Sequence, residues 1–120
     1  MSLEWVRACL SQGNAVVFGC VMPEHFATDT ARTGQLRYPE PGERPLFGHA
    51  LAALAHDDGH ENAPGDVGAL LCLTHYGEGF GLKGAMNGVS LRGLLWVPYS
   101  YWSNALAINA WTVHEMERGS

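Results

Sequence analysis

Four short apolar runs, each bounded by glycine, proline or polar residues, constrain the fold of this chain more than any other feature. They occupy residues 14–22 (NAVVFGCVM), 67–75, 91–97 and 108–116. The first run is β-branched and apolar at successive positions, which is typical of a strand buried on both faces, and the last run alternates. The sequence therefore predicts a mainly β chain of the α+β class.

Helical structure is predicted only at the N-terminus and in short turns. Residues 2–12 carry apolar side chains at the spacing of one helical face, with Ser2 as a candidate N-cap and Gly13 as a candidate stop. Short helical turns are expected in residues 23–29 (PEHFATD) and 99–107. The helical content should therefore be small.

The remaining segments are rich in turn-forming and polar residues. Three prolines and two glycines predict a surface loop or loose hairpin over residues 29–45. Residues 57–66 (DDGHENAPGD) are expected to form a polar, turn-rich loop, and residues 77–88, with five glycines, an irregular stretch. Residues 46–56 (LFGHALAALAH) are ambiguous, because their alanine and leucine content favours a helix on propensity alone.

Composition limits the class of protein. The chain has 120 residues, 47% apolar and 10% aromatic, without a repeat or linker, so a single domain over residues 1–120 with a real core is expected. A net charge of −5 without a Lys/Arg cluster disfavours nucleic-acid binding. No apolar run reaches bilayer length and no signal peptide is recognised, so we expect no membrane contact. The expected location is the cytoplasm or an assembled particle.

The order of segments resembles the C-terminal, β-rich half of papain-like cysteine peptidases. The similarity covers roughly residues 3–113, and five motifs in the family's order carry it: AVVFG, PGERPLFGHALAALAHDD, ALLCLTHYGEGFGLKG, LLWVPYSYW and AINAWTV. The resemblance implies a twisted antiparallel sheet or open barrel like the right-hand domain of papain, with an N-terminal helix. It also implies a strand, not a helix, for residues 46–56.

The resemblance assigns candidate catalytic residues. Gly48-His49-Ala50 takes the place of the family's catalytic histidine motif, and Thr74 takes the place of the asparagine that orients this histidine. A threonine hydroxyl accepts a hydrogen bond from an imidazole, although it is shorter than a carboxamide.

The resemblance also assigns candidate ligand-binding residues. Tyr76 and Phe80 occupy positions where the family has two tryptophans. Gly19, on the first predicted strand, and Ala50, next to His49, are expected to line the former substrate face.

The family's nucleophile has no counterpart in these residues. It lies in a mainly helical half that this chain lacks, and Cys9, Cys20 and Cys72 stand outside any QxxCGSCW-like motif. The apolar neighbours of Cys20 and Cys72 predict buried thiols with raised pKa values, and hence structural roles. About ten extra residues before LLWVPY leave residues 82–92 without a clear counterpart in the family.

No cofactor or metal is expected. Residues 56–61 (HDDGHE) hold two histidines and three carboxylates, but neither HExxH nor DxDxDG spacing, so a solvated turn is the better interpretation. The glycine run lacks a GK[ST] ending, which argues against a phosphate loop. The large aromatic residues near the C-terminus are expected mostly in the core: Trp96, Tyr99, Tyr101, Trp102 and Trp111.

These observations favour a non-catalytic, stand-alone papain-like half-domain that binds a peptide or protein or takes part in assembly. The alternative is the histidine-bearing subunit of a split cysteine peptidase, completed by a partner's cysteine. A weaker alternative is an inhibitor or immunity-type protein. A half-domain without its usual neighbour keeps an apolar face to cover, so a homo-oligomer or a larger assembly is expected.

Overall fold

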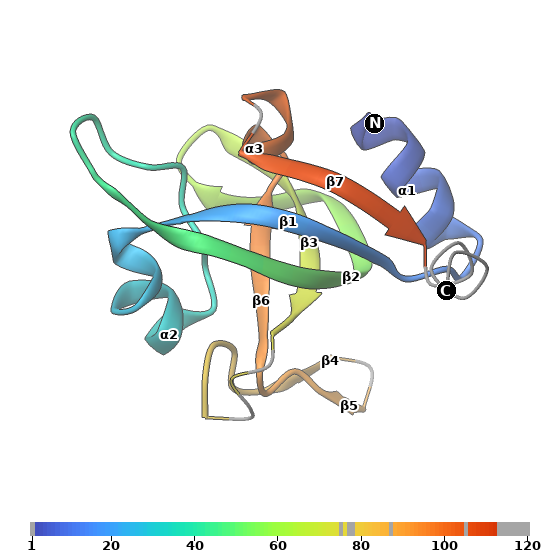
Figure 1. Ribbon diagram of the computed structural model, residues 1–120. Coiled ribbons are helices and arrows are strands. Elements are labelled where there is room, and N and C mark those ends of the chain that lie inside the picture. The colour runs from blue at the N-terminus through green and yellow to red at the C-terminus, as the bar shows by residue number, and fades with distance from the viewer. Residues whose placement is uncertain (1, 75, 77–78, 87, 105, 113–120) are drawn as a thin grey trace.

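The backbone is organised around one antiparallel sheet (Figure 1). The computed structural model describes residues 2–74, 76, 79–86, 88–104 and 106–112. The strands follow the order β6-β3-β2-β1-β7. Their bounds are β1 (Val16–Pro23), β2 (Pro45–Ala63), β3 (Asp66–Leu73), β6 (Leu94–Pro98) and β7 (Ala107–Thr112). Among the described strands the sheet is not closed, since β6 and β7 end the order. The predicted mainly β, open antiparallel fold is confirmed.

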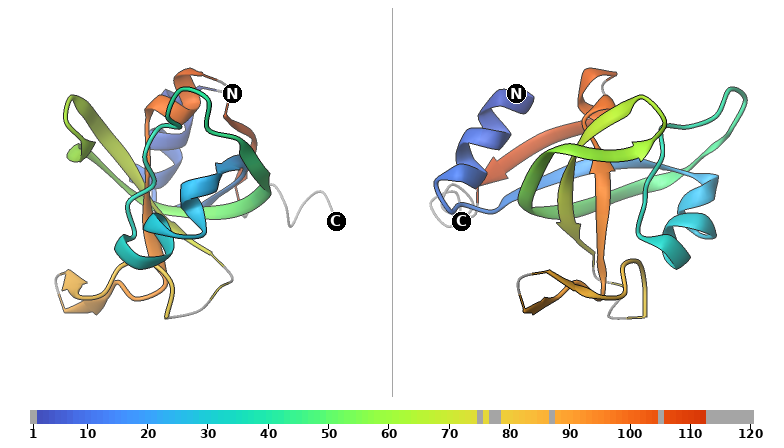
Figure 2. Two further views of the ribbon diagram at one scale, coloured as in Figure 1. Left: turned by 90° about the vertical axis from the view of Figure 1, so that its left-hand side faces the viewer. Right: turned by 180° about the vertical axis from the view of Figure 1, so that it is seen from behind.

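Strand β2 links the two halves of the sheet. Its first part pairs with β1, from Pro45 opposite Pro23 to Ala53 opposite Val16. Its second part pairs with β3, starting at Ala52 opposite Leu73. Register shifts interrupt this second ladder, and bulges of this kind bend a strand and increase its twist. The long strand therefore curves from one neighbour to the other, as the two further views show (Figure 2).

The structure resolves the ambiguous segment and corrects one loop. Residues 46–56 lie inside β2, so the strand implied by the resemblance is right. The helical propensity is overridden by ladder pairing with β1 up to Ala53 and with β3 from Ala52. The loop predicted for residues 57–66 is wrong, because β2 continues to Ala63 and only a tight turn with Gly65 at φ 81° precedes β3. Polar side chains are compatible with a strand here since one face is exposed.

The helices are short and lie at the margins of the sheet (Figure 1). Helix α1 (Leu3–Ser11) begins where predicted, and the Ser2 hydroxyl accepts the Trp5 N–H at 3.2 Å. The turn predicted for residues 23–29 contains η1 (Glu24–Phe26), and α3 (Ser100–Ser103) falls within residues 99–107. Among the described helices, none has the length and apolar character to cross a bilayer.

The proline-rich segment is not loop throughout. Helix α2 (Asp29–Thr33) occupies its first residues and ends at Gly34, which adopts the left-handed conformation at φ 75°. The next residues run beside β6, where the Leu36 N–H donates to the Trp96 carbonyl at 3.0 Å. The prediction of a surface loop therefore holds only for the later part of the segment, because Leu36 is fully buried.

The glycine-rich segment is irregular, as predicted, except for a small hairpin of β4 (Ala85–Met86) and β5 (Val89–Ser90). Gly81 has φ 83° and lies against the Leu94 carbonyl, where a Cβ would collide with the oxygen. Gly93, at φ 85°, precedes β6, so the strand predicted from residue 91 begins three residues later. Residues 75, 77 and 113–116, included in the predictions, lie outside the described residues.

The main core lies between the sheet, α1 and α3. Its largest fully buried side chains include Phe18, Met22, Phe26, Leu51 and Tyr101. Each contributes about 1.5–3 kcal/mol by burial, which is the main stabilising contribution in such a domain. The expectation that the C-terminal aromatics are mostly core is confirmed for four of them, which are buried or partly buried: Trp96, Tyr99, Tyr101 and Trp102. The side chain of Trp111 lies outside the described residues.

Candidate functional site

His49 sits near the start of β2 and points toward the core face of the sheet. Side chains alternate along a strand, and the buried residues His49, Leu51 and Ala53 share one face. His49 is the ladder partner of Cys20 on β1. Its side chain is 9% exposed. The local sequence thus places an imidazole at the margin of the core, where a strand end meets the surface.

Three aromatic rings lie next to this imidazole, and a fourth packs on two of them. The His49 ring centroid lies 5.3 Å from Tyr76, 5.8 Å from Phe26 and 6.0 Å from Phe47. Phe80 completes the group, stacked on Tyr76 at 5.2 Å and packed on Phe26 at 5.0 Å. These five residues, which we call the aromatic cluster, are brought together from η1, β2 and the segment that follows β3.

The aromatic cluster has a buried base and an exposed rim. Phe26 is 2% exposed and anchors the base, with its ring at 82° to that of Phe47 in an edge-to-face contact. At the rim, Phe47 is 36% exposed and Tyr76 is 44% exposed. Apolar area of this kind is well suited to contact a ligand with apolar side chains.

The structure brings together some of the predicted site residues. Tyr76 and Phe80 lie in the aromatic cluster with His49, as their positions in the resemblance imply. Thr74 is buried two residues before Tyr76, and its Oγ1 accepts the Tyr76 N–H at 3.1 Å. The orienting role of Thr74 toward His49 stays a prediction.

The other two predicted residues lie on the opposite face of the sheet. Gly19 and Ala50 are direct ladder partners, and their neighbours Cys20 and His49 form the adjacent pair. Because successive residues of a strand point to opposite faces, Gly19 and Ala50 cannot share a face with the His49 ring. Their contact with a ligand therefore requires one that wraps around the exposed start of β2.

Sequence reasoning missed Phe26 and Phe47. Phe47 stands two residues before His49, so once β2 is recognised as a strand the period of two places both on one face. Phe26 precedes His49 by more than twenty residues, and no local pattern marks it as a neighbour. Only the packing of η1 against the start of β2 brings it to the site.

The described cysteines are poor nucleophiles. Burial raises the pKa of Cys20 to about 12. Burial also raises the pKa of Cys72, with a further contribution from nearby Cys20. Cys9 is 8% exposed on α1. The prediction of buried thiols with raised pKa values is confirmed, although Cys20 faces His49 across the ladder in a way that the sequence did not reveal.

A second polar group lies far from the aromatic cluster, between α1 and β2. Ser11 Oγ is 3.3 Å from His56 Nε2, and His56 Nδ1 is 3.3 Å from Asp58 Oδ1, an order like that of a hydrolase triad. The backbone N–H groups after Ser11 are all used within the helix end, so they offer no oxyanion hole.

These side chains instead fasten the helix to the sheet. Asp58 accepts hydrogen bonds from Arg7 at 2.8 Å and from the Tyr99 hydroxyl at 2.5 Å. The Tyr99 bond, with the Arg7 charge, lowers the pKa of Asp58 despite some desolvation.

Within the described part of the chain, no group of three or more His, Cys, Asp or Glu residues is arranged to hold a metal ion. The prediction of a solvated turn for residues 56–61 is wrong, because these residues lie in β2 and the side chains of His56 and Asp58 contact neighbouring elements.

Comparisons with known proteins agree with this fold. The chain is 26% identical over 116 residues to an uncharacterized peptidase C1-like protein of Acanthamoeba polyphaga mimivirus, covering 95% of this chain and 32% of that protein. It superposes on xylellain, a cysteine protease from Xylella fastidiosa, with a TM-score of 0.63 and 22% identity, covering 92% of this chain and 36% of the protease. No protein-family model matches the chain.

Both similarities extend over nearly the whole chain and about one third of the other protein. The matched region contains β1, the aromatic cluster and the sheet that carries them. An open antiparallel sheet, with His49 on a strand, is what the resemblance implied. The chain is thus related to the papain-like cysteine peptidases and has the fold of part of one.

Proposed function

We propose that this chain is a papain-like β half-domain that binds an extended peptide or a protein segment at the aromatic cluster, without hydrolysing it. The observation that carries the proposal is the exposed rim of Phe47 and Tyr76 around a buried imidazole. Rigid aromatic side chains give large contact area at small entropic cost, and they dominate many recognition surfaces.

The backbone of β2 supports the same binding mode. Residues 45–51 pair with β1 on one side, whereas the ladder with β3 begins only at Ala52. Within the described residues, the other edge of this stretch has no strand partner. An extended peptide bound there would add main-chain hydrogen bonds to the side-chain contacts of the aromatic cluster.

The absence of a reactive thiol among the described residues supports a non-catalytic role. With a pKa of about 12, on the order of one Cys20 side chain in 10⁵ is ionised at neutral pH. A histidine without a thiolate to activate does not carry out acyl transfer. We therefore propose that His49 here contributes ring contacts and hydrogen bonding to recognition.

A binding experiment tests this proposal. Anisotropy of a fluorescein-labelled hexapeptide pool should detect binding to the wild-type chain, and Phe47→Ala and Tyr76→Ala should each weaken it by about 30-fold or more, the loss expected at a hot spot. Val67→Ala, which truncates a residue 51% exposed at the far end of β3, is the matched control and should bind like the wild type. Equal loss in the control, or no binding of the pool, would contradict the proposal.

A second candidate function is supported by the match to a cysteine protease. In this alternative His49 is a general base and Thr74 its orienting group, and the nucleophilic cysteine comes from outside residues 1–120. An electrophilic thiol probe distinguishes the two. His49-dependent labelling of a partner's cysteine in a native complex would favour the split peptidase, and its absence would favour binding alone.

An inhibitor or immunity-type role is a weaker candidate. Such a protein would occupy the active site of a papain-type peptidase by copying one half of it. Titration of the purified chain against such peptidases tests this role, because stoichiometric loss of their activity is the expected result. Unchanged activity would remove this candidate.

A further inference from the structure

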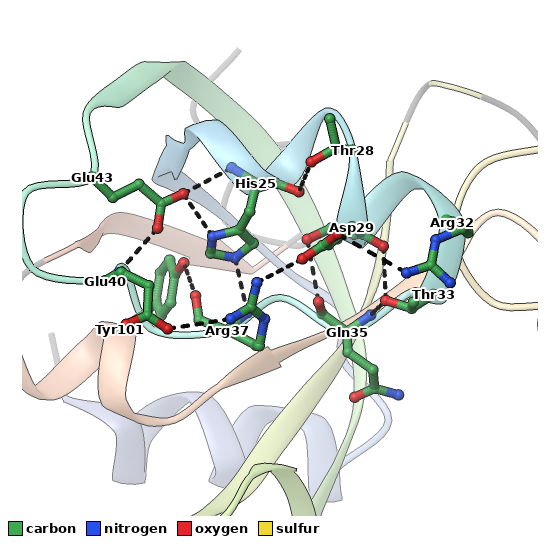
Figure 3. Close-up of polar contacts among 11 residues, drawn as sticks. His25, Thr28, Asp29, Arg32, Thr33, Gln35, Arg37, Glu40, Glu43 and Tyr101 are labelled. Carbon is green, nitrogen blue, oxygen red and sulfur yellow. Dashed lines mark hydrogen bonds and ion pairs between the residues drawn. The ribbon is translucent and has the colours of Figure 1, made fainter.

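His25, on η1, uses both ring nitrogens in hydrogen bonds (Figure 3). Its Nδ1 lies 2.8 Å from Glu43 Oε2, which also accepts the His25 backbone N–H at 2.8 Å. Its Nε2 accepts the backbone N–H of Arg37 at 3.1 Å. The His25 side chain is 8% exposed and that of Glu43 is 11% exposed. The ring therefore joins η1 to both ends of a projecting loop, residues 38–44, which we call the arm.

The bond from Arg37 determines the charge state of this ring. A backbone N–H only donates, so Nε2 must carry a lone pair and no proton. The ring proton then lies on Nδ1 and is donated to the Glu43 carboxylate. A doubly protonated imidazole has two donors and no acceptor, so it cannot keep the bond to Arg37. This contact exists in one charge state only.

The neighbouring charges keep their own partners. The Arg37 guanidinium bonds Asp29 at 2.7 Å and Glu40 at 3.4 Å, and Glu24 accepts the Arg44 N–H at 2.9 Å. The hydroxyl of Tyr101, from α3, donates to the Arg37 carbonyl at 2.6 Å (Figure 3).

The surroundings of Glu43 favour its carboxylate form. Desolvation alone would raise the pKa of Glu43, but the N–H groups of Glu40 and His25 and the His25 ring outweigh it and lower the pKa. A proton added to this pair binds at the Nε2 atom of His25, because Nδ1 already carries the ring proton and the surroundings of Glu43 favour its carboxylate form.

We propose that His25 is a pH-sensitive latch, and that protonation of its Nε2 releases the Arg37 N–H and moves the arm, which weakens binding at the aromatic cluster. The regulatory part rests on the proposed peptide-binding function. The protonated ring keeps its ion pair with Glu43, so the release occurs at the Arg37 end of the arm.

The latch is connected to the aromatic cluster through the backbone. Phe26, the base of the cluster, is the residue after His25. The arm leads directly into β2 at Pro45, and the Glu24 N–H donates to the Arg44 carbonyl at 3.2 Å. Movement of the arm therefore reaches both the base and the rim of the cluster, since η1 and the start of β2 are its two attachments.

Cavities on both sides of the arm leave room for this movement. One cavity of about 570 Å³ is lined by Glu24, His25, Arg37 and residues of the arm. A second, of about 510 Å³, lies on the other side and is lined by Val21, Leu106 and the proline-rich part of the arm. Besides His25, the arm is held by Tyr101, whose ring contacts Tyr38, and by the bond from the Arg44 N–H to Glu24.

The test follows the Arg37 amide by NMR between about pH 8 and pH 5. Its protection from hydrogen exchange, corrected for intrinsic rates, should fall by about tenfold for each pH unit below the transition, because one proton is taken up. Glu43→Gln removes the carboxylate that favours the imidazolium, so it should move the midpoint of the transition to lower pH. His56→Gln, which removes an imidazole outside this network, is the matched control and should leave the midpoint unchanged.

His25→Gln should abolish the titration of the Arg37 amide, and the wild-type titration remains decisive if this variant does not fold. A flat protection profile for Arg37 in the wild type, or a midpoint unaffected by Glu43→Gln, would overturn the latch. Binding of the hexapeptide pool is measured at the same pH values. Failure of the pool to bind at any pH would contradict the peptide-binding function, whereas constant affinity across a normal Arg37 transition would contradict only the regulation.

Discussion

At the residue scale, the chemistry of His49 is decided by its neighbours more than by its own motif. It faces Cys20 across the β1–β2 ladder, a pairing that in another setting would suggest a thiolate and its base. Burial makes that thiol hard to ionise and packs the imidazole among aromatic rings. The same two residue types would act as a catalytic pair only with a solvated, low-pKa thiol.

Gly81 occupies a position where a side chain would meet both a left-handed backbone and a close backbone contact. Gly42 has the same φ of 83° but nothing within 4 Å of the position that an alanine methyl group would take, whereas Gly81 meets the Leu94 carbonyl. We expect Gly42→Ala to cost about 1 kcal/mol from the left-handed backbone alone, and Gly81→Ala to cost at least about 2 kcal/mol because a steric clash is added. Urea midpoints of the two variants measure the difference, and equal midpoints would show that the contact with Leu94 is unimportant.

At the scale of elements, β2 connects the two halves of the sheet. It pairs with β1 through its apolar half and with β3 through its polar half, so one strand positions His49 at one end and Asp58 and His60 toward the other. His60 stacks on Trp96 at 4.2 Å, which holds the polar half against β6. Helix α1 is then fastened to β2 by both apolar and polar contacts.

The apolar contact should be the stronger attachment of α1. Val6 is fully buried, and Val6→Ala should cost about 1.5–3 kcal/mol through lost burial and the cavity left behind. Arg7→Gln breaks the ion pair with Asp58, which is exposed and screened by water, so the midpoint of unfolding should hardly change. Chemical denaturation of both variants tests this order, and a larger loss for Arg7→Gln would reverse it.

At the scale of the whole molecule, the apolar surface is unevenly distributed. Leu54 and Leu73 are each 45% exposed on β2 and β3, close to the small residues Ala50 and Ala52 of the outward sheet face. A sheet face with this composition is commonly covered by another domain or another subunit. This exposed apolar area is consistent with the expectation, made from the sequence, of a homo-oligomer or a larger assembly.

We expect the purified chain to associate in a concentration-dependent way. Leu54→Asp or Leu73→Asp should shift it toward the monomer, because each places a charge on the apolar face. Sedimentation velocity over a range of concentrations makes the measurement, with Val89→Asp, at a residue 65% exposed on β5, as the matched control. A wild-type chain that stays monomeric throughout would contradict the proposal.

The candidate site was predictable only where its residues are near one another in sequence or follow a motif. The Gly48-His49-Ala50 motif identified the histidine, and the aromatic positions after β3 identified Tyr76 and Phe80. Phe26 was not predictable, since its contact depends on how η1 packs against β2. Gly19 and Ala50 were assigned to the site by motif, but the register of the ladder places them on the other face.

The sequence by itself determined the apolar strands, the Ser2-capped helix and the burial of the cysteines, because each depends on local pattern or on the polarity of a few neighbours. For residues 46–56 the family resemblance, and not local propensity, predicted a strand. Tertiary structure alone decided that this strand continues through residues 57–63, against their turn propensity. Ladder hydrogen bonds from two neighbouring strands stabilise β2 as a whole, and they connect residues far apart in the chain. The aromatic cluster and the His25 contacts arise in the same way, from packing between elements that no local pattern relates.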